Sequence, residues 1–129
     1  MADKILRFGK DGVFKILMFG DIHGCAPSRD LFDPRIKDDV AKLVDITSPD
    51  FVILSGDIVG GRRGVGTAEE LRAFLDYLIP SIEEFSIPWA NVFGNHDWED
   101  GCDPVSRPGM PKEVQEAVYE SYKYCLSQA

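Results

Sequence analysis

The segment FVILS at residues 51–55 constrains the fold most, because its first four side chains are all apolar. Such a short, uninterrupted apolar run is typical of a strand that is buried on both faces of a parallel sheet. Comparable strand-like runs stand at residues 13–19 and 89–93. Segments with the 3.6-residue periodicity of helices separate the three runs, and this alternation predicts an α/β fold with a mixed, mainly parallel sheet and helical crossovers.

Three helices are predicted from apolar side chains that recur every three or four residues. They span residues 35–47, 68–79 and 112–126. Asp33 before Pro34 is a typical N-cap for the first helix, and Thr67 with Glu70 forms a capping-box pattern for the second. Pro80 should stop or kink the second helix. The side chains expected to face the core from the third helix are Val114, Val118, Cys125 and Leu126.

A β-hairpin is predicted at the start of the chain. Its strands would lie at residues 4–8 and 13–19, joined by the turn signal Asp11-Gly12. The predicted strands at 13–19 and 51–55 are apolar toward both faces, whereas three helices can cover only part of a sheet. We therefore expect either a large exposed apolar face or self-association through it, the alternative being helices on both faces, as in a doubly wound sheet.

The composition restricts the class of protein. The chain has 129 residues, enough for one domain, and its net charge of −8 argues against non-specific nucleic-acid binding. It shows no signal-peptide core and no apolar run long enough to span a membrane, so we expect no membrane partner. An odd number of cysteines, three, is more typical of reduced thiols in a cytoplasmic protein than of a disulfide framework.

Polar side chains follow each of the three predicted parallel strands. They are Asp21 and His23 after the first, Asp57 after the second, and Asn95, His96 and Asp97 after the third. Ligands of such sheets bind at the carboxyl ends of the strands, so these side chains should meet at one rim. Side chains at positions i and i+2 of an extended backbone, such as Asp21 and His23, also point the same way. Carboxylates with imidazoles suit a divalent transition ion, although each motif alone could be an ordinary turn.

The conjunction of these motifs resembles the calcineurin-like metallophosphoesterase family, and most of all its purple-acid-phosphatase-like intracellular branch. The matching motifs are Asp21-Ile22-His23, Gly56-Asp57-Ile58-Val59 and Gly94-Asn95-His96-Asp97. The resemblance covers essentially the whole chain. It implies that residues 1–129 are a single, incomplete domain, the N-terminal half of an α/β/β/α sandwich.

The resemblance also implies a dinuclear metal centre. Asp21 and His23 would hold the first ion, Asp57 would bridge both ions, and Asn95 would hold the second through its amide oxygen. His96 would protonate the leaving group or steady the phosphoryl oxygens, and Asp97 would orient its ring. Gly60 stands where purple acid phosphatases carry a tyrosine, so two like divalent ions such as Mn, Zn or Fe are expected.

The implied reaction is hydrolysis of a phosphate mono- or diester, with a phosphorylated small molecule or phosphoprotein as substrate. The family completes its site with further histidines, but no histidine follows His96 here, so we expect weakly held metals and little activity. The alternative is a truncated pseudo-phosphatase that acts as a weak metal-binding or interaction module. Side chains that could complete the site or reach a substrate phosphate are Arg62, Arg63, Glu99, Asp100 and Asp103.

Overall fold

The computed structural model describes residues 6–60, 64–97 and 110–127. Its strands are β1 (Ile16–Phe19), β2 (Phe51–Leu54) and β3 (Trp89–Asn91). They form a parallel sheet in the order β1-β2-β3, in which Met18 lies opposite Ile53 and Leu54 lies opposite Asn91. The predicted α/β class and parallel strand order are confirmed, and β2 and β3 end within two residues of the predicted bounds.

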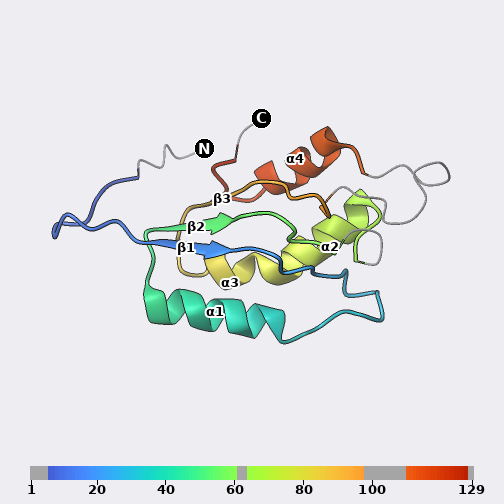
Figure 1. The fold of residues 1–129 in the computed structure, drawn as a ribbon, viewed down its shortest axis with the longest axis horizontal. Coiled ribbons are helices and arrows are strands. Elements are labelled where there is room, and N and C mark those ends of the chain that lie inside the picture. Colours follow the sequence, from blue (N-terminus) through green and yellow to red (C-terminus); the bar gives the residue numbers. More distant parts are fainter. Residues whose placement is uncertain (1–5, 61–63, 98–109, 128–129) are drawn as a thin grey trace.

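The helices pack on one another and on one face of the sheet (Figure 1). They are α1 (Ile36–Thr47), α2 (Ala68–Leu78), α3 (Pro80–Glu83) and α4 (Lys112–Glu120). Val52 and Leu54 of β2 point into the core between the sheet and the helices and are fully buried. None of the helices in the described part of the chain has the length and apolar character needed to span a bilayer.

The opposite face of the sheet is open in the described residues. Ile16 and Met18 of β1 are 54% and 60% exposed, and Phe51 and Ile53 beside them are only partly buried. The strand pleat explains the contrast, because alternate side chains along each strand point to opposite faces. The expected exposed apolar face is therefore present, and self-association through it stays a prediction.

The predicted helix starts are correct to within a few residues, but one capping detail differs. Asp33 accepts hydrogen bonds from the backbone N–H and the guanidinium of Arg35, so it closes the turn before α1 instead of capping the helix. Thr67 caps α2 as expected, since its hydroxyl accepts the N–H of Glu70 at 3.1 Å. The carboxylate of Glu70 accepts hydrogen bonds from the N–H of Gly66 and from Arg29, and a backbone hydrogen bond from Thr67 also helps to lower its pKa. Pro80 separates α2 from α3, as predicted.

The last helix is shorter than predicted, because the chain after Glu120 pairs with the edge of the sheet. The N–H of Trp89 donates to the carbonyl of Tyr124 at 3.0 Å, and the N–H of Leu126 donates to the carbonyl of Trp89 at 2.7 Å. These bonds satisfy backbone groups of an edge strand that a continued helix would leave unpaired. Val114 is also 39% exposed, whereas Gln115 is buried, so the predicted inward face of this helix is wrong at its first turn.

The predicted N-terminal hairpin forms its turn but not its first strand. The N–H of Gly12 donates to the carbonyl of Gly9, and the N–H of Gly9 donates to the carbonyl of Val13, both at 2.9 Å. Residues 6–8 are not in a strand, and residues 4 and 5 lie outside the described part. The Phe8 ring contacts that of Phe14 edge-to-face at 5.9 Å but is 74% exposed, so little apolar burial among the described residues supports a second ladder there.

Candidate metal centre

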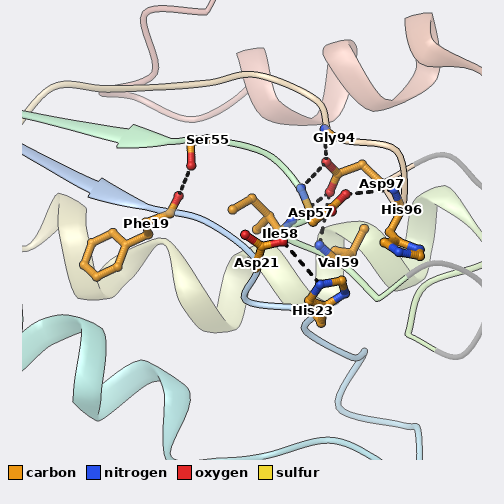
Figure 2. Close-up of polar contacts among 10 residues, drawn as sticks. All are labelled: Phe19, Asp21, His23, Ser55, Asp57, Ile58, Val59, Gly94, His96 and Asp97. Carbon is orange, nitrogen blue, oxygen red and sulfur yellow. Dashed lines mark hydrogen bonds and ion pairs between the residues drawn. The ribbon is translucent and has the colours of Figure 1, made fainter.

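The loops that follow the three strands meet at the carboxyl edge of the sheet (Figure 2). The N–H of Asp21 donates to the carbonyl of Gly56 at 3.1 Å, and the N–H of His23 donates to the carbonyl of Asp57 at 2.9 Å. These bonds continue the pairing of β1 and β2 beyond the strands. They place the first and second polar motifs side by side, as the parallel topology predicts.

Asp21, His23 and Asp57 form a cluster whose possible ligand atoms all lie within 4.8 Å of one another. The His23 Nε2 and the Asp21 Oδ1 are 3.6 Å apart, which is longer than a hydrogen bond. Ligand atoms that each lie about 2 Å from one ion are within roughly 4 Å of one another, so small side-chain rotations would close the cluster. Two carboxylates and one imidazole are a donor set suited to Zn, Mn or Fe, and the residues fit such an ion.

The backbone brings these side chains together in an unexpected way. Asp21, His23 and Asp57 have φ angles of 51°, 49° and 50°, in the left-handed region that non-glycine residues seldom adopt. The sequence suggested that an extended strand makes Asp21 and His23 point the same way. Neither residue has an extended backbone, so this reason is wrong. They converge on Asp57 from left-handed backbone conformations just beyond Phe19, the last residue of β1.

His96 lies next to the cluster. Its ring centroid is 5.1 Å from that of His23, with the rings inclined at 63°. Its backbone N–H donates to Asp57 Oδ1 at 2.8 Å, so one carboxylate oxygen of Asp57 is fixed by the loop after β3. Asn95, the preceding residue, is exposed, and its role as a ligand of a second ion stays a prediction.

Asp97 is 5% exposed, and its carboxylate accepts four backbone N–H groups. Oδ2 accepts from Asp57 and Gly94, both at 2.7 Å, and Oδ1 accepts from Ile58 at 2.8 Å and Val59 at 3.1 Å. Within the described residues none of its donors is the imidazole of His96, which the sequence reasoning expected. The reason is positional, because the buried carboxylate faces the backbone of the β2 loop (Figure 2).

Two glycines allow the loops after β2 and β3 to interlock. A Cβ at Gly94 would lie 2.6 Å from the backbone nitrogen of Asp57, and one at Gly56 would lie 2.7 Å from the nitrogen of Gly94. Gly56 also has a φ of +104°, which L side chains rarely adopt. In the sequence, Gly56-Asp57 and Gly94-Asn95 stand out only as family motifs or as turn signals. A single sequence carries no signal for the close contact between the two.

A charged pair near the site was also missed by the sequence reasoning. Arg29 makes two hydrogen bonds of 2.9 Å to the carboxylate of Glu70, and Glu70 accepts the N–H of Gly66 at 2.7 Å. The hydrogen bonds from Arg29 hold the pKa of Glu70 below its ordinary value. The pair anchors the end of the loop that leads into α2, and the 41-residue separation leaves no sequence signal.

Five of the candidate residues are outside the described part of the chain. They are Arg62, Arg63, Glu99, Asp100 and Asp103. Cys25, which follows the first motif, is buried, and burial raises the pKa of its thiol. A buried, protonated thiol is a poor nucleophile, so Cys25 is not a candidate nucleophile for this site.

The fold and the cluster define an α/β protein with a candidate divalent-metal site on the loops after its parallel strands. The chain belongs to the calcineurin-like phosphoesterase family, whose family model matches residues 14–125. This match includes all three strand-end motifs and therefore the whole cluster described above.

Three relatives are similar to this chain over about 100 residues. "Probable inactive purple acid phosphatase 28" of Arabidopsis thaliana is 35% identical over 73% of this chain and 26% of its own length. "Phosphatase DCR2" of Saccharomyces cerevisiae is 33% identical over 69% of this chain and 17% of its own length. "Probable inactive purple acid phosphatase 14" of Arabidopsis thaliana is 29% identical over 73% of this chain and 26% of its own length. The chain thus spans about a quarter or less of these relatives.

Proposed function

We propose that this chain carries part of a metal-dependent phosphoesterase centre that hydrolyses phosphate mono- or diesters. The observation that supports the proposal most is the convergence of Asp21, His23 and Asp57 from two different loops. Family membership supports the same reaction class. The substrate would be a phosphorylated small molecule or a phosphoprotein.

The proposed roles combine the family resemblance with the geometry of the described side chains. Asp21 and His23 would hold one divalent ion, while Asp57 would offer the oxygen that the N–H of His96 does not engage. Bound divalent ions would lower the pKa of a water and neutralise charge on the phosphoryl group. His96, whose ring lies beside that of His23, would donate a proton to the leaving alkoxide. Asn95 would hold a second ion.

The proposal includes a limit on activity. Three described ligands make a weak site, and no histidine follows His96 in the sequence to add a further one. Phosphate-ester hydrolysis is among the slowest uncatalysed reactions, so partial stabilisation leaves a high barrier. The 129-residue chain should therefore bind metal weakly and hydrolyse its substrate slowly.

The two buried, unpaired thiols of Cys25 and Cys125 support a cytoplasmic location for the protein.

A second candidate is a non-enzymatic module that binds metal weakly and acts through its surface. Two of the similar proteins are named as probably inactive phosphatases. The open sheet face with Ile16 and Met18 gives such a module an apolar surface. The two candidates differ in one measurable property, which is metal-dependent turnover.

Mn²⁺ titration followed by electron paramagnetic resonance, with a parallel assay on p-nitrophenyl and bis-p-nitrophenyl phosphate, tests the proposal. We expect weak Mn²⁺ binding and slow, Mn²⁺-dependent hydrolysis, both lost in Asp57→Asn. The matched control is Asp45→Asn, which neutralises an exposed carboxylate on α1 and should change neither. Binding without turnover would favour the second candidate, and equal Mn²⁺ binding by Asp57→Asn would refute the proposed site.

A further inference from the structure

We infer that Asp97 is a positioning residue, which sets the place of the Asp57 carboxylate by holding the backbone of the loops after β2 and β3. The inference rests on the proposed metal-dependent function, because Asp57 is a proposed ligand. It departs from the sequence expectation, in which Asp97 acts on the ring of His96.

The hydrogen-bond pattern carries the first step. Three successive N–H groups, those of Asp57, Ile58 and Val59, all point at the Asp97 carboxylate, with distances of 2.7–3.1 Å. Hydrogen bonds from N–H groups to a carboxylate are stronger than bonds between neutral groups. The carboxylate is almost fully buried, so solvent does not compete for these donors.

The second step is that the contact is reciprocal. Asp97 holds the backbone N–H of Asp57, and the neighbouring N–H of His96 holds the side chain of Asp57 through Oδ1 at 2.8 Å. Asp97 also accepts the N–H of Gly94, which contacts Asp57 closely. Both ends of Asp57 are therefore fixed by the same short segment, residues 94–97.

The third step concerns the backbone of Asp57, which has a φ of 50°. A non-glycine residue stays in the left-handed region only when its surroundings enforce it. The bond from the Asp57 N–H to Asp97, together with the bond from the His23 N–H to the Asp57 carbonyl, provides that constraint on both sides. Loss of the Asp97 carboxylate should let Asp57 relax and move its free oxygen away from Asp21 and His23.

Asp97→Asn tests the inference because it keeps the side-chain shape but replaces one oxygen by an N–H₂ donor. Whichever way the amide turns, two of the four backbone donors lose their acceptor. We expect Mn²⁺ affinity to fall about 10–100-fold, the range found when groups that orient metal ligands are removed. Amide hydrogen exchange, measured without metal, should quicken before other buried amides at the pair that loses its acceptor, which is either Asp57 with Gly94 or Ile58 with Val59.

The matched control separates positioning from general loss of stability. Val44→Ala removes buried apolar contact on α1, which contributes no residue to the site. It should lower the free energy of unfolding and leave the Mn²⁺ affinity of the folded protein within about threefold. A drop in affinity shared by both variants would mean that Asp97 is merely structural, and this would overturn the inference.

The outcomes also distinguish the inference from the proposed function. Wild-type affinity for Mn²⁺ in a folded Asp97→Asn variant refutes the positioning role and leaves the metal site intact. If the wild type binds no Mn²⁺, the proposed function fails, and exchange that stays slow at the four amides in Asp97→Asn refutes the positioning role separately. Where Asp97→Asn does not fold, Asp97→Glu, which adds one methylene to the buried carboxylate, replaces it. Unchanged Mn²⁺ affinity in that variant overturns the inference.

Discussion

Gly24 connects the candidate site to the core, and Gly24→Ala should destabilise the fold by overpacking. A Cβ at this position would lie 2.8 Å from Phe74 Cε1, and two other atoms of that ring would be closer still. Phe74 is fully buried on α2, so its ring has no open space to enter. Gly24 cannot withdraw easily either, because its N–H donates to Ile58 and its carbonyl accepts from Gly60, at 2.8 and 2.9 Å.

The magnitude follows from this confinement. Extra atoms in a packed core that cannot yield cost about 1–3 kcal/mol, and we expect a loss of that size in the free energy of unfolding. Phe74→Leu removes the ring edge that the new methyl group would meet, at a cost of about 1–2 kcal/mol for the lost packing. The double variant should therefore be at least about 1 kcal/mol more stable than the sum of the two single losses predicts.

Urea unfolding followed by tryptophan fluorescence measures this, since Trp89 is fully buried and should change its emission on unfolding. Gly66→Ala is the matched control, because its Cβ would meet only flexible side-chain ends at 3.4 Å or more. It should change stability by less than about 0.5 kcal/mol. Strict additivity of Gly24→Ala and Phe74→Leu, within about 0.5 kcal/mol, would refute the overpacking argument.

Two further predictions concern titratable groups. Hydrogen bonds from Arg29 lower the pKa of Glu70 below its ordinary 4.5, so the pair stabilises the fold above that pH and the gain disappears as pH falls through the lowered pKa. The difference in unfolding free energy between wild type and Glu70→Gln should thus be largest above about pH 5 and shrink in acid, and a difference that grows in acid would contradict this sign. Burial raises the pKa of the Cys25 thiol, so iodoacetamide at pH 8 should label Cys25 far more slowly in the native than in the urea-unfolded protein, as read by peptide mass spectrometry. Equal labelling rates would show that the thiol is accessible.

The parts of the fold that a single sequence predicts are those set by local patterns. The apolar run at Phe51–Leu54 and the helical periodicity around it give the parallel order, and the parallel order alone places Asp21, His23 and Asp57 at one edge. These predictions needed no knowledge of side-chain contacts. They follow from periodicity and from the handedness of crossovers.

The parts that failed depend on contacts between distant residues. The chain leaves α4 at Glu120 because Tyr124 and Leu126 find backbone partners at Trp89, about 35 residues earlier. Helical periodicity continues through residues 121–126, so the sequence pattern predicts a longer helix than the structure has. Three of the four donors of Asp97 are likewise 38–40 residues away in the β2 loop, whereas the motif alone suggests that the carboxylate contacts its neighbour His96.

The segment Asp57–Ile58–Val59 shows why the core and the candidate site depend on each other. The side chains of Ile58 and Val59 are 1% exposed and belong to the core. The side chain of Asp57, the residue before them, belongs to the candidate metal cluster. The backbone N–H groups of all three residues donate to the Asp97 carboxylate. This one buried carboxylate therefore links the position of two core residues to the position of one proposed ligand. A backbone shift of this segment that accommodates a core substitution would also move the oxygen that Asp57 offers. Changes in the core beneath Ile58 should therefore affect metal affinity more than equally destabilising changes on α1, since α1 contributes no residue to the cluster.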